Sequence, residues 1–221
     1  MEPNEIWRDV RVRELAIAGA QGDLSKIEDL VESGVDINSA GEFGATPIWW
    51  SIQRQNKAGY LKMLELGADP NKVWSRSGRT FTYYVATLGD SYYLEQALKH
   101  GANPNQITNT VAKTTPLYAA ASHPRSHVRN TKLLIDFDAD VNVKNSIGET
   151  PLMFALLMGR FDTAYLLVEA GTDLTVRQTL TDKSALDYLK GWRDRRPEGF
   201  SEPSIMKNLF RLFDEELTLT D

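Results

Sequence analysis

One five-residue phrase recurs five times along the chain, and each copy begins 33 to 37 residues after the previous one. Its clearest form is Gly-x-Asp-x-Asn, and the copies occupy residues 34–38, 67–71, 101–105, 138–142 and 171–175. A second phrase, Thr-Pro in its clearest form, repeats in phase and begins at Thr46, Thr80, Thr115, Thr150 and Ser184. Two phrases that share one period indicate stacked copies of one small structural unit. Stacked-repeat chains present a long concave surface, and they usually bind other molecules rather than catalyse reactions.

Composition excludes several classes of function. The chain has 221 residues, of which 42% are hydrophobic and 25% charged, as in an ordinary globular domain. Its net charge of −5 argues against general nucleic-acid binding, which needs many Lys and Arg side chains. The absence of cysteine excludes disulfides, thiol nucleophiles and Cys-ligated zinc.

The sequence also gives an expectation for location. Residues 1–8 have neither the basic nor the apolar region of a signal peptide. No stretch reaches the roughly 18 uninterrupted apolar residues of a membrane span. We therefore expect a cytoplasmic protein without a membrane partner, and a periplasmic one only if an export signal has been removed.

The unit that begins at Thr150 shows the local structure most clearly. Thr150 can cap a helix and Pro151 suits its first turn, so an inner helix is predicted over residues 152–158. Gly159 is expected to end it in the left-handed conformation, and an outer helix follows over 163–170. Gly171 ends that second helix, and an extended turn leads to the next unit.

This unit of two helices and an extended finger resembles the ankyrin repeat. The resemblance is carried by Gly-x-Thr-Pro-Leu at 148–152, by Gly159, by the Leu pair at 166–167 and by Gly-x-Asp at 171–173, and it covers about residues 9–190. It implies an all-α ankyrin-repeat solenoid of about five to six repeats, including caps. Residues 1–8 are then expected to be an N-terminal tail. Residues 191–221 are expected to form a loop, over 192–200, and an amphipathic capping helix, over 204–213.

Several units depart from the ankyrin pattern. The first lacks the Thr-Pro opening, Phe81 replaces Pro in the third, and Asp138 replaces Gly at the end of the fourth. The fourth also carries extra residues at 122–127, and the finger over 105–115 is longer than the others. Insertions of this kind mark either a binding surface or neutral drift at the surface.

No set of residues suggests catalysis. His123 and His127 are four residues apart, but Pro124 lies between them and no third metal ligand is near in sequence. His100 ends a helix, where a cation is favourable. There is no Gly-x-Ser-x-Gly elbow, and residues 19–22 lack the Lys of a phosphate loop. We therefore expect no enzyme, no metal site and no cofactor.

The inner helices carry more aromatic residues than is usual in ankyrin repeats, where they line the concave groove. The third residue after each repeat Thr or Ser is Trp49, Tyr83, Tyr118, Met153 or Asp187, and we expect this set to be partly exposed in the groove. The fourth is Trp50, Tyr84, Ala119, Phe154 or Tyr188, and for this set burial between helices is favoured. Trp74, on a finger, is the strongest single candidate contact. The predicted partner-binding residues are Phe43, Trp49, Arg54, Trp74, Arg76, Arg79, Tyr83, Leu88, Tyr118, His123, Arg125, Met153 and Met158.

The resemblance implies a non-catalytic protein-protein interaction module, monomeric on its own. Small standalone ankyrin proteins include bacterial adaptors and inhibitors that neutralise a toxin encoded beside them, and this is the narrower expectation. An alternative is a carrier of a planar small molecule or cofactor, stacked in the aromatic column. A passive spacer predicts a polar concave face, which these aromatic residues oppose. The identity of the partner stays open, because a scaffold does not define its ligand.

Overall fold

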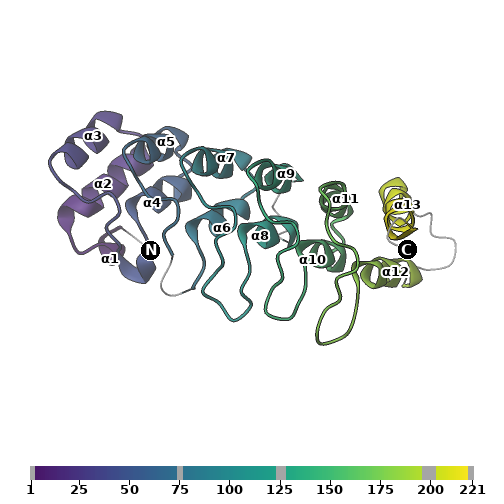
Figure 1. The fold of residues 1–221 in the computed structure, drawn as a ribbon. Coiled ribbons are helices and arrows are strands. Elements are labelled where there is room, and N and C mark those ends of the chain that lie inside the picture. Colours follow the sequence, from purple (N-terminus) through teal and green to yellow (C-terminus); the bar gives the residue numbers. More distant parts are fainter. Residues whose placement is uncertain (1–2, 74–76, 123–127, 196–202, 219–221) are drawn as a thin grey trace.

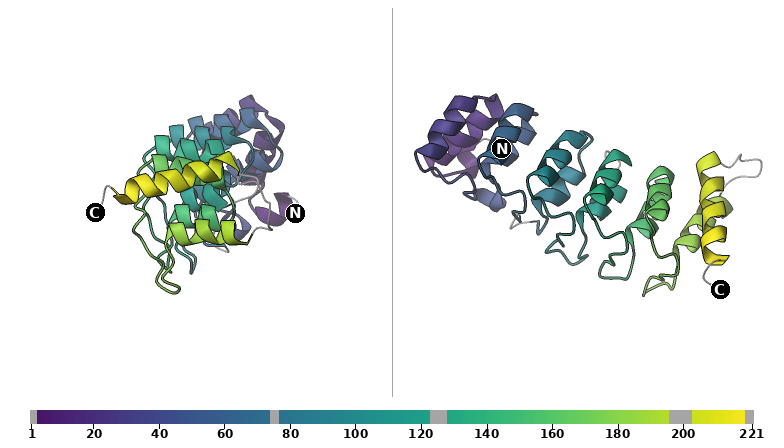
Figure 2. Two further views of the ribbon diagram at one scale, coloured as in Figure 1. Left: turned by 90° about the vertical axis from the view of Figure 1, so that its right-hand side faces the viewer. Right: turned by 45° about the horizontal axis from the view of Figure 1, so that its top comes forward.

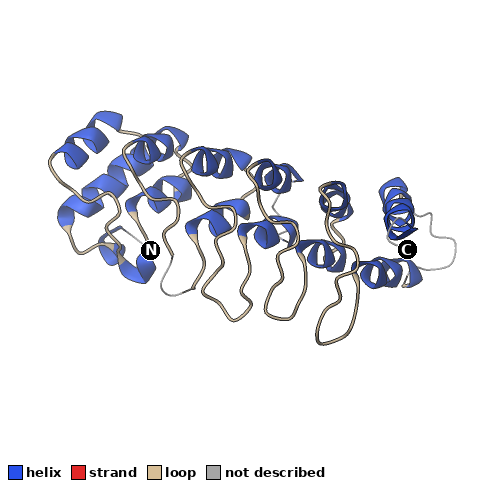
Figure 3. Ribbon diagram, in the orientation of Figure 1, coloured by secondary structure: helices blue, strands red, loops and turns tan. Residues whose placement is uncertain are grey.

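The computed structural model describes residues 3–73, 77–122, 128–195 and 203–218. The chain forms an elongated stack in which helices lie in two layers and long loops project beyond one of them (Figure 1). The described residues contain helices but no strand, as Figure 3 shows, and two isolated β-bridges lie in the loops. The expected all-α solenoid is thereby confirmed.

Two helices build each unit of the stack. The inner layer consists of α2 (Val10–Gln21), α4 (Pro47–Gln53), α6 (Phe81–Ala86), α8 (Pro116–Ser122), α10 (Pro151–Leu157) and α12 (Ala185–Asp194). The outer layer consists of α3 (Leu24–Glu32), α5 (Lys57–Glu65), α7 (Ser91–Lys99), α9 (Val128–Asp136), α11 (Phe161–Glu169) and α13 (Ser204–Thr218). A short helix α1 (Pro3–Ile6) precedes them, and one 3₁₀ turn, η1, covers Glu42–Gly44. The view along the stack in Figure 2 separates the two layers.

The Thr-Pro phrase starts the inner helices as the sequence indicates, and three of its five copies supply a side-chain cap. The hydroxyls of Thr80, Thr150 and Ser184 each accept a hydrogen bond from the backbone N–H three residues later. Such a bond satisfies one of the unpaired donors of a helix start. The hydroxyls of Thr46 and Thr115 are buried without a hydrogen-bond partner among the described residues.

The Gly-x-Asp-x-Asn phrase links each unit to the next. The Asn71 side chain donates to the Gly101 carbonyl at 2.9 Å and accepts from the Asn103 backbone N–H at 2.7 Å. The equivalent residues Asn38, Asn105 and Asn142 make the same pair of bonds to their following units. The recurring Asn is therefore a rung of a ladder that runs along the array.

The first residue of each phrase, four residues before the Asn where the Asn is present, has a left-handed backbone. Four of the five copies have Gly there, with φ between 82° and 93°, whereas Asp138 adopts φ 62°. A residue with a Cβ is strained in this region. We expect Asp138→Gly to stabilise the fold by about 0.5–1 kcal/mol, measured as a higher urea midpoint. The reverse change in another copy, Gly101→Asp, should lower the midpoint, and a loss of stability in Asp138→Gly would contradict this reading.

The projecting loops are called fingers 1 to 5 and comprise residues 35–46, 68–80, 102–115, 139–150 and 172–184. Backbone hydrogen bonds join fingers 2 to 5 in sequence: Asn109 donates to Gly78, Ser146 to Ala112 and Thr179 to Ile147, at 2.7–3.0 Å. These fingers therefore lie side by side as one connected edge (Figure 1).

Both ends of the chain differ from the sequence expectation. The N-terminal tail expected over residues 1–8 is wrong for residues 3–8, because they include α1 and because Ile6 and Trp7 are only 2% exposed. The loop expected over 192–200 is wrong at its start, since α12 continues to Asp194. Helix α13 packs against α11 and buries Met206, Leu209 and Phe213, where the sequence predicted an outer capping helix.

Candidate partner-binding surface

The inner helices and the fingers together form what we call the inner face, the face that the resemblance predicts to be concave. Its most developed part lies on α4, α6 and finger 2. We call this group of six side chains the aromatic ledge: Trp49, Gln53, Arg54, Arg79, Tyr83 and Tyr84. The three aromatic residues are half-buried, and the two arginines and Gln53 are exposed. Amphipathic rings with one exposed side are typical anchors of protein interfaces.

The two arginine side chains of the ledge lie over aromatic rings. The Arg79 guanidinium lies 5.4 Å from the centre of the Tyr83 ring, and that of Arg54 lies 4.9 Å from the Trp50 ring. Arg79 belongs to finger 2 and Tyr83 to α6, so this contact joins finger to helix. A stacked guanidinium retains its N–H donors for a carboxylate or carbonyl of a partner.

A hydrogen bond ties neighbouring units across the ledge. Gln53 Nε2 donates to the Tyr84 hydroxyl at 2.7 Å. Burial raises the pKa of Tyr84, and hydrogen bonds with Gln53 and Trp49 partly oppose that shift. The phenol is therefore protonated at neutral pH, and the aromatic side chains of α4 and α6 are held in fixed positions.

The aromatic column does not continue as an open surface beyond α6. Tyr118 and Met153 are each 1% exposed, so the prediction that they line the groove is wrong. The Tyr118 hydroxyl accepts from the Asn145 backbone N–H at 3.0 Å and donates to carbonyls of Val143 and Glu149. Finger 4 thus covers this ring, and burial raises the pKa of Tyr118.

The other described candidates lie outside the ledge. Leu88, after α6, is half-buried against the core, and Met158, after α10, is 45% exposed. Phe43 is 37% exposed and has a left-handed φ of 61°. It lines a cavity of about 350 Å³ together with Trp7 and Val12. Trp74, Arg76, His123 and Arg125 fall outside the described residues.

A buried carboxylate holds fingers 4 and 5 together. Glu149 is 5% exposed and accepts hydrogen bonds from Asn145, Gln178 and Tyr188 at 3.1–3.2 Å. Burial and the Glu149 charge raise the pKa of Tyr188. Because three donors satisfy this carboxylate, its role is structural rather than that of an acid or base.

The fingertips carry exposed aliphatic side chains that the sequence reasoning missed. They are Val73, Ile107, Val111 and Leu180, and the last two are 95% and 75% exposed. The sequence could have revealed them, because these four aliphatic residues lie in turns between the two repeated phrases, where no core position is expected. One side chain alone would mean little, but the four recur on one connected edge.

Two kinds of site find no support among the residues that the structure describes. No group of three or more His, Asp or Glu side chains is arranged to hold a metal ion. No described helix is both long enough and apolar enough to cross a bilayer.

A cavity of about 630 Å³ on the outer helices is lined by Lys57, Glu95 and Arg129, whose charges form ion pairs within the chain.

Comparisons with known proteins agree with this geometry. A family model of ankyrin repeats, in three copies, matches residues 83–178. Protein PhlB of Serratia liquefaciens is 31% identical over 147 residues, which are 66% of this chain and 62% of PhlB. This chain therefore spans less than two thirds of that relative.

Solved structures share the fold along most of the chain. The ankyrin repeat domain ABAYE2397 of Acinetobacter baumannii has a TM-score of 0.73 at 24% identity, covering 90% of this chain and 96% of that one. A chain from the complex of the predatory endopeptidase Bd0816 with immunity protein Bd3460, from Bdellovibrio bacteriovorus, has a TM-score of 0.66 at 24% identity, covering 82% and 93%. The ankyrin fold generally serves as a binding scaffold without catalytic activity. Residues 83–178 are therefore ankyrin repeats, and the described part of the chain has the fold of an ankyrin repeat domain.

Proposed function

We propose that this chain is a non-catalytic module that holds a partner protein on its inner face, at the second and third repeats. The observation that carries the proposal is the aromatic ledge. Its exposed Arg79 lies over half-buried Tyr83, and its exposed Arg54 lies over the Trp50 ring, which half-buried Trp49 contacts. Trp, Tyr and Arg are the residues that most often dominate binding energy at protein interfaces. The hydrogen bond from Gln53 to Tyr84 keeps the surface ordered before binding, which lowers the entropic cost of association.

The narrower proposal is that the partner is a bacterial toxin or effector enzyme, and that binding inhibits it. Its support is the similarity to a chain from an endopeptidase–immunity protein complex, together with bacterial relatives. We propose the cytoplasm as the compartment, and the periplasm if the chain is exported. The carrier of a planar ligand is not proposed, because the aromatic column that motivated it is interrupted where Tyr118 and Met153 are buried.

Site-specific photo-crosslinking in the native cell tests the proposal. A photoreactive phenylalanine analogue replaces Tyr83 in one variant and Tyr92, half-buried on the outer helix α7, in a matched control. We expect one protein to be captured by the Tyr83 variant and not by the control. Equal capture by both variants would place the partner elsewhere and refute the assignment of the ledge.

The purified partner then allows a quantitative test. We expect Arg54→Ala combined with Arg79→Ala to weaken partner binding at least about tenfold, because truncating interface arginines often costs more than about 1.4 kcal/mol. Removing the same charge from the outer helices, with Arg129→Ala and Arg211→Ala, should leave the affinity within about twofold. Calorimetry measures both. If the partner is an enzyme, its activity should fall on addition of the protein and recover with the Arg54/Arg79 variant.

A further inference from the structure

The fingertips form a second surface that the ledge does not include. Val73, Ile107, Val111 and Leu180 are exposed on fingers 2, 3 and 5, with Val111 at 95%. The backbone hydrogen bonds between fingers 2 and 5 hold these tips in one connected edge. A row of exposed aliphatic side chains at fixed positions is unfavourable in water and is characteristic of an interaction site.

The same loops carry a small excess of positive charge. Over fingers 2 to 5 the sequence has seven Lys or Arg and five Asp or Glu residues, and fingers 3 to 5 each carry an exposed lysine: Lys113, Lys144 and Lys183. The whole chain, by contrast, has a net charge of −5. In the part of the chain that the structure describes, Lys113, Lys144 and Lys183 form no ion pair. Fingers 2 to 5 therefore have a weakly positive formal charge, and the negative charge of the chain lies on the rest of it.

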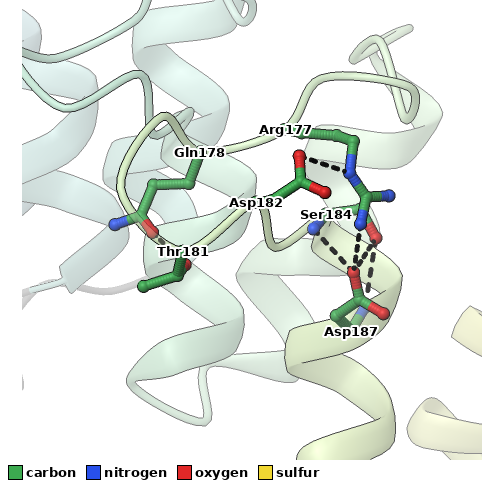
Figure 4. Close-up of polar contacts among 6 residues, drawn as sticks. All are labelled: Arg177, Gln178, Thr181, Asp182, Ser184 and Asp187. Atoms are coloured by element: carbon green, nitrogen blue, oxygen red, sulfur yellow. Dashed lines mark hydrogen bonds and ion pairs between the residues drawn. The ribbon is translucent and has the colours of Figure 1, made fainter.

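Finger 5 shows the contrast between a structural cation and an available one. The Arg177 side chain bonds to Asp182 at 3.0 Å and to Asp187 at 3.4 Å, as Figure 4 shows. Asp187 also accepts from Ser184 in a capping box that starts α12. The Arg177 charge thus stabilises the finger, whereas exposed Lys183 has no carboxylate partner among the described residues and lies 5.7 Å from the Tyr188 ring.

We infer that the edge of fingers 3 to 5 docks an acidic, aliphatic-rich segment of the partner protein. The inference rests on the proposed function, since this segment and the surface held by the ledge belong to one partner. Carboxylates would pair with the three lysines, and aliphatic side chains would cover Val111 and Leu180. Complementary charge of this kind raises the association rate and selects among partners. A protein segment fits better than a nucleic acid, because the exposed apolar residues of fingers 3 to 5 are aliphatic rather than stacking aromatics and because the chain is acidic.

A peptide-display experiment tests the chemistry without knowledge of the partner. A library of random displayed peptides is selected on the purified protein, in the presence of excess soluble K113E/K144E/K183E variant to remove peptides that bind elsewhere. We expect the retained peptides to be enriched in Asp and Glu together with Leu, Ile or Val. A synthesised peptide should bind at least about tenfold more weakly to the K113E/K144E/K183E variant and to V111S/L180S, and more weakly as salt rises.

The matched control is K99E/K132E/K207E, which makes the same charge change on the outer helices α7, α9 and α13. It should bind the peptide within about twofold of wild type, and thermal unfolding should show all variants folded. Retained peptides without acidic residues, equal weakening by the control, or preferential binding of a single-stranded oligonucleotide to the fingers would overturn the inference. If the native partner depends on Arg54 and Arg79 but not on the three lysines, the inference fails and the proposed function stands. The reverse dependence refutes the ledge and retains the finger edge.

Discussion

Replacing Gly59 with alanine is expected to destabilise the protein by about 3 kcal/mol, near the upper end of what overpacking a core costs. Gly59 is buried in α5 where that helix packs against Gly19 of α2. A Cβ at residue 59 would lie 2.8 Å from the Gly19 carbonyl carbon and 3.0 Å from its Cα, besides contacting the carbonyl oxygen. These are backbone atoms, so only a separation of the two helices can relieve the clash.

The control is Gly191→Ala in α12. A Cβ there would meet only the mobile end of the Arg195 side chain, at 3.5 Å. Alanine is about 1 kcal/mol better than glycine inside a helix, so this variant should be equally stable or slightly more stable. Urea unfolding followed by circular dichroism measures both changes. A Gly59→Ala midpoint equal to that of wild type would show that α2 and α5 separate without cost.

The repeated phrases predicted the order and the approximate ends of the helices, because capping and left-handed turns are local properties of sequence. They did not predict the Asn ladder, since Asn71 and Asn103 become neighbours only when two units stack. The contact between Gly19 and Gly59 was missed for the same reason. The sequence shows that both residues are glycines, but it does not show which residue each of them contacts.

The candidate site was predicted only in part because the position of a residue on its helix does not reveal what covers it. Trp49, Tyr83, Tyr118 and Met153 occupy equivalent positions, yet the first two are half-buried and the last two are buried. The difference at Tyr118 arises from finger 4, which supplies polar backbone groups to its hydroxyl. The exposed aliphatic residues of the fingertips were not predicted, because hydrophobic periodicity identifies core positions and assigns no role to an exposed Val or Leu.

The second large effect is expected at the N-terminus, where Trp7→Ala should destabilise the protein by about 3–5 kcal/mol. Trp7 is 2% exposed and meets the Trp50 ring edge-on at 6.4 Å. Its indole N–H donates to the Ala45 carbonyl at 3.1 Å, so α1 is fixed to both α4 and finger 1. A Cβ on Gly41 would lie 2.7 Å from the indole ring, so the first finger has no room for a side chain there.

The location of the damage distinguishes a cap from an ordinary core residue. In a stacked array each unit contacts only its neighbours, so loss of the Trp7 contact should open the first units and spare the distant ones. Hydrogen exchange should therefore speed up in α2 and α4 of Trp7→Ala and stay near wild type in α10 and α11.

The control variant Trp7→Phe retains most of the packing but loses the hydrogen bond to Ala45. It should therefore destabilise the protein less than Trp7→Ala does. Uniform loss of protection along the array would mean that it unfolds as one cooperative unit, and a change below about 1 kcal/mol would mean that residues 3–8 do not cap it.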